Sequence, residues 1–175
     1  LQTVCAQHYD DIYDVFKDTK LNLLDKVSLN SRVAHISTGL SEKINSGFNE
    51  QILLNETEFA EFIIKMVSDK ILRTVENNEK RPFSDEDLKS NLITGFTSGY
   101  YMYFRKIFND INLGRIEIPS IQYKAANFYF IREYCYGSMF RYNASGEFNI
   151  PYGGMSYNSK NMRTKIDNMF NSSSG

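Results

Sequence analysis

A short segment near the C-terminus concentrates side chains that can read the edges of DNA bases. The segment spans residues 139–152, with the sequence MFRYNASGEFNIPY. An arginine can donate two hydrogen bonds to guanine O6 and N7, and an asparagine can pair with an adenine edge. Tyrosines such as Tyr136 and Tyr142 can stack on a base or wedge between base steps. The candidate readers of base edges are Arg141, Asn143 and Asn149.

The same segment has the pattern of a β-hairpin. Two short runs, Met139–Asn143 and Glu147–Ile150, flank Ala144-Ser145-Gly146. Gly146 can adopt a positive φ at the end of a three-residue loop, and Pro151 ends the second strand because it lacks an N–H. A β-ribbon of this kind is narrow enough to enter a major groove. The alternative is an ordinary hairpin with half-buried tyrosines and with its arginine and asparagines in water.

Residues for covalent or metal chemistry are scarce. The two histidines, His8 and His35, and the two cysteines, Cys5 and Cys135, are far apart in the sequence. No Cys/His cluster therefore has the spacing of a zinc site. Neither of the phosphate-binding patterns GxxxxGK[ST] and GxGxxG occurs. We expect no catalytic residue, no metal site and no cofactor in this chain.

Composition places the chain among ordinary globular proteins. Of its 175 residues, 42% are apolar and 23% are charged, which argues against disorder. Two cysteines are too few for a disulfide framework, and reduced thiols are typical of the cytoplasm. No run approaches the roughly 20 apolar residues of a membrane span, and no secretory signal is visible. We expect a cytoplasmic module with no membrane partner, cut from a longer polypeptide.

The net charge of −1 hides an asymmetry. Residues 1–95 hold 11 basic and 16 acidic residues, a charge of −5, whereas residues 96–175 hold 9 and 5, a charge of +4. A basic part can favour a polyanionic partner, although a solvated surface is the simpler interpretation. We divide the chain accordingly into a helical part of uncertain role, 1–95, and a nucleic-acid-binding part, 96–175, within one compact module.

Helical periodicity covers most of the remaining sequence. Asn55 can cap a helix that ends before Pro82, and Ser84 can cap the next one, in which Gly95 and Gly99 would permit close packing. Pro119 can occupy the first turn of a further helix. The expected helices cover residues 4–16 and 21–27, a short stretch within 31–48 between loops, a helix from 56 that ends in the run ENNEKRPF at 76–83, and residues 85–108, 119–131 and 161–170. The expected fold is therefore mainly α, a helical bundle with one projecting β-hairpin near the C-terminus.

Three runs occur in a specific order in the C-terminal part. They are YFRKIFND at 103–110, AANFYFIREYCYG at 125–137 and MFRYNASGEFNIPYGGMSYN at 139–158. Together they resemble the DNA adenine-N6 methyltransferases of the Dam and DpnII type, whose hairpin has the form N-G-L-x-R-x-N-x-x-G-x-F-N-x-P-F-G. The matching residues are Arg141, Asn143, Gly146, Phe148, Asn149, Pro151 and Gly153.

The resemblance implies a target recognition domain, which in that family is a helical bundle whose hairpin enters duplex DNA. It implies that Arg141 reads a guanine of a short palindromic site such as GATC and that Tyr136 inserts at the target base pair. Met139 stands where an apolar residue discriminates a flanking base. Arg132, on the helix before the hairpin, is expected to make a phosphate contact or a structural one. Gly137-Ser138 replaces the family's Asn-Gly, so that a base- or phosphate-contacting asparagine is missing.

The family's catalytic motifs do not occur in this chain. That family binds S-adenosylmethionine through an F-x-G-x-G loop and acts on a flipped adenine through a D-P-P-Y tetrad. The prolines here are Pro82, Pro119 and Pro151, so no Pro-Pro pair exists. We therefore expect an inactive recognition part of a restriction-modification methyltransferase, whose missing catalytic domain would hold the S-adenosylmethionine. The alternative is a helical protein–protein interaction module with a fortuitous hairpin.

Overall fold

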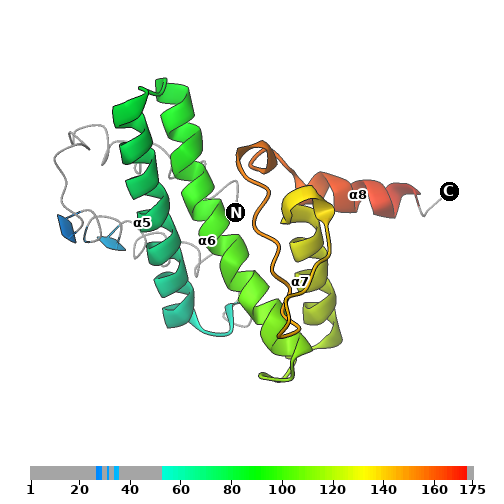
Figure 1. Ribbon diagram of the computed structural model, residues 1–175. Helices are drawn as coiled ribbons and strands as arrows, with labels where there is room; N and C mark the ends of the chain where they lie inside the picture. Colours follow the sequence, from blue (N-terminus) through cyan, green and yellow to red (C-terminus); the bar gives the residue numbers. More distant parts are fainter. Residues whose placement is uncertain (1–26, 29–30, 32–33, 36–52, 173–175) are drawn as a thin grey trace.

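The computed structural model describes residues 27–28, 31, 34–35 and 53–172. In Figure 1 the helices labelled α5, α6 and α7 lie side by side, and α8 extends away from them. The elements, in chain order, are α5 (Glu56–Lys80), α6 (Asp85–Asn112), α7 (Ile121–Tyr134), the single-turn helices η2 (Tyr136–Ser138) and η3 (Met155–Tyr157), and α8 (Met162–Ser172). The prediction of a mainly helical fold is confirmed for these residues. The helices predicted over 4–16, 21–27 and 31–48 lie outside the described residues apart from isolated positions.

Side-chain caps determine where α5 and α6 begin. The Asn55 Oδ1 accepts a hydrogen bond from the backbone N–H of Glu58 at 3.0 Å. The Ser84 Oγ accepts one from the N–H of Asp87 at 3.1 Å. Each cap satisfies a backbone donor that has no partner within its helix. Pro82 lies between the two helices, so that both predicted starts and the predicted break are confirmed.

The antiparallel pair α5 and α6 forms the largest helix–helix contact among the described elements. A Cβ at Gly99 would lie 3.2 Å from the Ile63 Cδ1 and 3.3 Å from the Met66 Cβ. The absence of a side chain at Gly99 therefore lets α5 approach closely. None of the described helices is long and apolar enough to span a membrane.

Aromatic rings fill the core between the helices. Phe59 of α5 meets Tyr103 of α6 edge-on, with 5.2 Å between the ring centroids. The Tyr103 hydroxyl is buried and donates to the backbone oxygen of Asn55 at 3.0 Å, and burial raises the pKa of Tyr103 to about 12. On the other side of α6, Phe104 meets Phe130 of α7 at 5.5 Å. The core is thus continuous from α5 to α7.

The last two helices start and end near their predicted positions. The Ser120 Oγ caps α7 by accepting from the Tyr123 N–H at 3.1 Å. Pro119 therefore precedes the cap and does not occupy the first turn as expected. Ile131 of α7 is fully buried, whereas α8 buries none of its residues.

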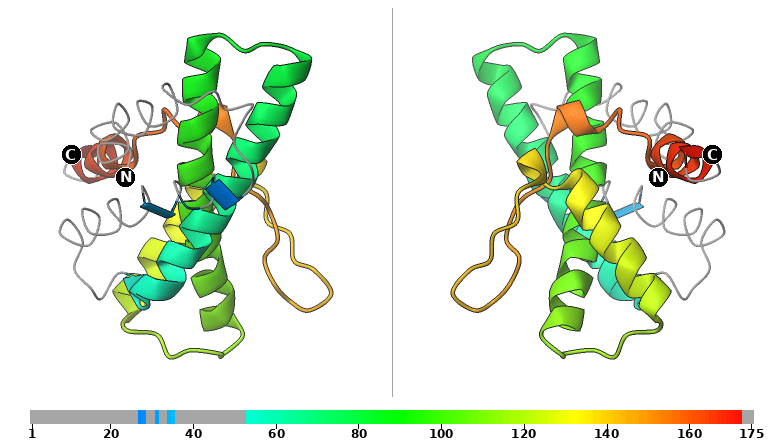
Figure 2. Two further views of the ribbon diagram at one scale, coloured as in Figure 1. Left: turned by 90° about the vertical axis from the view of Figure 1, so that its left-hand side faces the viewer. Right: turned by 90° about the vertical axis from the view of Figure 1, so that its right-hand side faces the viewer.

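The predicted projecting β-hairpin is not supported. Residues 139–152, called the 139–152 loop below, turn back on themselves but form no regular strand among the described residues. Two isolated antiparallel bridges, Tyr142 with Phe148 and Cys135 with Tyr152, are all the pairing that remains. Figure 2 shows the loop at one side of the helices.

The reason for this departure is that the backbone pairing between the two arms is interrupted at Met139 and Pro151. Cross-loop bonds run from Asn143 N–H to the Glu147 oxygen at 2.9 Å and from Asn149 N–H to the Arg141 oxygen at 3.2 Å. At the next pair Pro151 has no N–H to donate, and the Met139 N–H bonds the Tyr136 oxygen at 3.3 Å instead. The outer edge of the returning arm, residues 147–152, bonds side chains of α6. Phe148 and Ile150, on that arm, are also buried. The loop is therefore attached to the bundle along one arm.

Candidate nucleic-acid interface

The side chain of Asn109, on α6, bonds both backbone groups of one residue, Phe148, on the returning arm of the loop. Its Nδ2 donates to the Phe148 oxygen at 3.1 Å, and its Oδ1 accepts from the Phe148 N–H at 2.8 Å. Two residues on, the Tyr101 hydroxyl at 2.9 Å and the Arg105 Nη1 at 3.0 Å donate to the Ile150 oxygen. Because these contacts are largely buried, the arm is fixed to α6 over at least one turn of that helix.

Asn143 closes the tip of the loop. Its Oδ1 accepts from the backbone N–H of Ser145 at 3.0 Å and of Glu147 at 2.9 Å. Gly146 has a φ of 75°, so the predicted positive φ is confirmed. An asparagine side chain that bonds the backbone two residues on is typical of tight turns. In this conformation the Asn143 carbonyl oxygen stabilises the turn.

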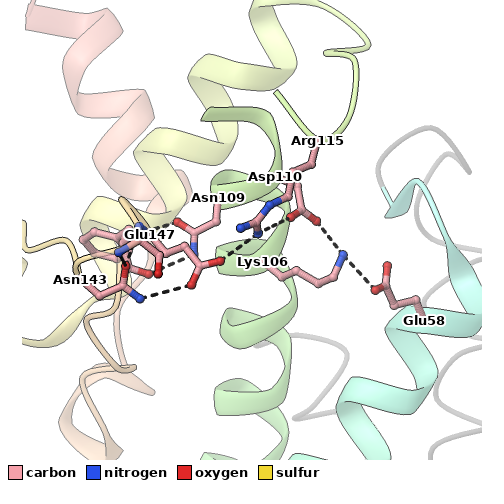
Figure 3. Close-up of polar contacts among 9 residues, drawn as sticks. Glu58, Lys106, Asn109, Asp110, Arg115, Asn143 and Glu147 are labelled. Carbon is pink, nitrogen blue, oxygen red and sulfur yellow. Dashed lines mark hydrogen bonds and ion pairs between the residues drawn. The ribbon is translucent and has the colours of Figure 1, made fainter. Parts of the chain in front are cut away.

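A chain of charged side chains connects α5 to this tip (Figure 3). The Lys106 Nζ lies 2.9 Å from the Glu58 carboxylate and 2.6 Å from that of Asp110. The Arg115 Nη1 bridges Asp110 at 3.2 Å and Glu147 at 2.8 Å. The hydrogen bond from Arg115 lowers the pKa of Glu147 below its ordinary value. The acidic side chain nearest the tip is therefore neutralised by a partner.

Arg141 lies on the outgoing arm of the loop and is exposed. Its Nε donates to the Oδ1 of Asn149 on the returning arm, at 3.1 Å. This bond uses the inner nitrogen of the guanidinium and not its two terminal nitrogens. A terminal pair of N–H donors is the group that can bond guanine O6 and N7 together.

Three further predicted residues expose apolar surface around the loop. The exposed fractions are 57% for Tyr136, 48% for Met139 and 49% for Tyr142. The Tyr142 ring meets Phe148 edge-on at 5.9 Å and is half exposed. Met139 and Tyr142 thus lie on the loop itself, and Tyr136 lies in η2 at the base of the loop.

Arg132 occupies the last turn of α7 and is exposed, two residues before the helix ends. The neighbouring Glu133 carboxylate pairs with Lys165 of α8, and the Lys160 Nζ donates to the Glu133 backbone oxygen at 2.6 Å. Because Lys165 neutralises Glu133, this end of α7 has a net positive charge at neutral pH. That is compatible with a phosphate contact by Arg132.

A shallow groove of about 450 Å³ runs between the ends of α6 and α7 and the loop. It was not anticipated from the sequence. Ile121 and Phe128 line it and are largely exposed, and Tyr142 forms one edge. The full lining consists of Phe108, Asn112, Ile121, Lys124, Ala125, Phe128 and Tyr142.

Within the described ranges, the structure offers no arrangement for metal chemistry. No group of three or more His, Cys, Asp or Glu side chains could hold an ion there. Cys135 is fully buried, and burial raises the pKa of its thiol, so that it is a poor nucleophile at neutral pH. His8 and Cys5 lie outside the described residues.

Two functional supports were missed by sequence reasoning. Asn109 and Arg115 were assigned no role, although both hold the loop. A signal for Asn109 exists, since it lies in the run YFRKIFND that carries part of the family resemblance. Asn109 is buried, and a buried polar side chain must find a partner. Arg115 offers no comparable signal, because charged residues in connections are usually solvated.

Comparison with known proteins finds a distant similarity to a methyltransferase. Over 105 residues the chain is 26% identical to the type II methyltransferase M.MjaIII of Methanocaldococcus jannaschii. The match covers 58% of this chain and 36% of that protein, so the chain spans about a third of its length. No protein-family model matches, and no solved structure does. The chain is thus distantly similar to a type II methyltransferase.

Proposed function

We propose that this chain binds duplex DNA at a specific short site, as the target recognition part of a DNA adenine-N6 methyltransferase. The observation that carries the proposal is Arg141, exposed on a loop that α6 side chains fix in place. Two further observations support it. The sequence of the loop resembles the recognition hairpin of the Dam and DpnII type, and the distant relative is a type II methyltransferase.

In the proposed complex the loop approaches the major groove. The terminal nitrogens of Arg141 bond guanine O6 and N7 in a site similar to GATC. Tyr136 inserts at the base step beside the target adenine, and Met139 contacts a flanking base. Asn149 orients Arg141 through their hydrogen bond, and Arg132 contacts a phosphate. Asn143 contributes indirectly, because its side chain closes the turn at the tip of the loop.

The chemistry of methyl transfer belongs to the rest of the proposed enzyme. A catalytic domain outside this chain supplies the S-adenosylmethionine site and the tetrad that receives the flipped adenine. The recognition part then fixes where on the duplex that domain acts. Separate recognition and catalytic parts are expected of a methyltransferase in a restriction-modification system.

The test is a binding selection on random duplexes at moderate salt with the full chain. We expect enrichment of one short, palindromic sequence that contains a guanine–adenine step. An Arg141→Ala chain carried through the same selection should lose the preference at the guanine. Recovery of random sequence by the original chain would reject sequence-specific recognition.

A second candidate function is a helical module that binds another protein. The exposed Ile121 and Phe128 in the groove favour it, because contiguous apolar surface often marks a protein interface. Such a module would show no salt-dependent affinity for duplex DNA. Phe128→Ala should then weaken partner binding while DNA binding stays absent.

A further inference from the structure

The turn that presents Tyr136 has an unusual backbone. Gly137 has a φ of 62°, and Ser138, which carries a Cβ, has a φ of 50°. Left-handed conformations are uncommon for residues other than glycine and persist where the surroundings hold them. A contact that fixes this turn therefore determines how Tyr136 and Met139 are presented.

A side chain that follows the loop in sequence provides such a contact. The hydroxyl of Tyr157, in η3, accepts a hydrogen bond from the Gly137 N–H at 3.0 Å. Backbone bonds also brace the turn, from the Tyr136 N–H to the Pro151 oxygen at 2.9 Å and from the Ser138 N–H to the Cys135 oxygen at 3.2 Å. Figure 2 shows η2 and η3 next to each other at the base of the loop.

The Tyr157 ring is held in place on several sides. It meets Tyr152 edge-on at 6.2 Å, and the Lys160 Nζ lies 3.6 Å from its centroid. A Cβ at Gly153 would lie 2.4 Å from ring atoms, so the ring rests directly on the Gly153 backbone. Glycine at this position therefore makes room for the ring.

We infer that Tyr157 is a positioning residue, whose hydroxyl fixes the Tyr136–Met139 turn in the conformation that engages DNA. The inference rests on the proposed function. Tyr157 need not touch DNA itself, since it acts through the Gly137 amide. Gly153 serves the same end by admitting the ring of Tyr157.

The decisive variant is Tyr157→Phe, which removes the hydroxyl and keeps the ring. We expect the Gly137 amide to exchange with solvent about fivefold faster, and affinity for the selected duplex to fall about fivefold, as one lost hydrogen bond implies. With 2-aminopurine at the adenine of that duplex, the fluorescence rise on binding should be smaller. Affinity for a shuffled duplex should stay within about twofold, because no phosphate contact is lost.

Two companion variants test the interpretation. Tyr134→Phe is the matched control, since its hydroxyl donates to the Lys160 oxygen at 3.2 Å on the same side of the molecule. It should leave the fluorescence rise unchanged. Gly153→Ala keeps the Tyr157 hydroxyl but displaces the ring, and should reproduce the loss seen in Tyr157→Phe. Thermal melting of each variant establishes that it is folded.

The outcomes separate the inference from the proposed function. If the original chain binds the selected duplex and Tyr157→Phe leaves affinity and fluorescence unchanged, the inference is wrong and the proposed function stands. If the original chain binds no duplex, both are rejected, whatever the Gly137 amide exchange shows about the hydrogen bond. Faster exchange together with weaker, less fluorescent binding to the selected duplex alone would establish the positioning role.

Discussion

Arg141 and Arg132 lie on different elements and should contribute differently to DNA binding. Arg141→Ala should remove about 1–3 kcal/mol of discrimination between the selected and a shuffled duplex. Arg132→Ala should weaken both duplexes alike and reduce the salt slope of binding by about 1. Fluorescence anisotropy with both variants at one fixed salt concentration checks this. The assignment fails if Arg132→Ala is the variant that relaxes specificity.

Asn109 is expected to matter for stability because it pairs two buried backbone groups of one residue. Asn109→Ala leaves the Phe148 N–H and C=O without partners, which should lower the free energy of unfolding by about 2–4 kcal/mol. Urea denaturation measures the loss. Asn77→Ala, the same change on an exposed part of α5, should shift stability by no more than about 0.5 kcal/mol. Equal effects of the two variants would contradict the anchoring role of Asn109.

At the scale of elements, the attachment of the loop tip should depend on pH through Glu147. Its pKa in the folded chain is held below the ordinary value of 4.5, chiefly by the hydrogen bond from Arg115. A depressed pKa stabilises the folded form above pH 4.5, and this contribution is lost as pH falls through the lower, folded value. Below pH 4.5 we therefore expect the amides of residues 143–147 to be less protected from exchange, relative to their intrinsic rates at each pH.

Arg115→Gln separates this effect from general acid unfolding. In that variant the Glu147 carboxyl, followed by NMR, should titrate closer to its ordinary pKa. Arg163→Gln, on the exposed face of α8, serves as the matched control and should leave the titration of Glu147 unchanged. A Glu147 pKa that is the same in all three proteins would show that Arg115 does not hold the tip.

Local rules predicted the elements whose determinants are close in sequence. Asn55 and Ser84 cap their helices through bonds to residues three positions away. The positive φ of Gly146 likewise follows from its own place in a turn. The predicted hairpin was wrong because the pairing of the two arms stops at Met139 and Pro151. The returning arm is fixed instead by Asn109, which is 39 residues from Phe148 in the chain. No local pattern shows that a helix side chain bonds the outer edge of that arm.

The candidate site follows the same division between local and distant determinants. Exposure of Arg141 and Tyr136 agrees with what their residue types suggested, whereas their roles on DNA stay predictions. Asn143 was chosen as a possible base reader, and its Oδ1 instead closes the tip in this structure. The supports Arg115 and Tyr157 could not be found, because each meets the loop only through the tertiary fold.

For the whole molecule, we expect neither binding of S-adenosylmethionine nor adenine methylation by this chain alone. The sequence lacks both the glycine loop and the D-P-P-Y tetrad of the family that it resembles. Titration calorimetry with the cofactor should give no binding heat, and a methylation assay on the selected duplex should give no product. Micromolar binding of the cofactor would contradict this expectation.

The division of the chain at residue 95 also stays a prediction at this scale. The basic part, 96–175, carries 9 Lys and Arg residues, and several of these form internal ion pairs, as Lys106 and Arg115 do. Few phosphates can therefore be neutralised, so affinity for DNA should be modest. A strong preference for one sequence must then come from contacts to bases.

The central claim, sequence-specific recognition of duplex DNA, is tested most directly by binding two duplexes over a range of salt. Anisotropy titrations would compare the selected duplex with a shuffled one of equal length and composition. The account predicts tighter binding of the selected duplex at every salt concentration, with affinity for both falling as salt rises. Equal affinity for the two duplexes, or affinity that does not change with salt, would contradict it.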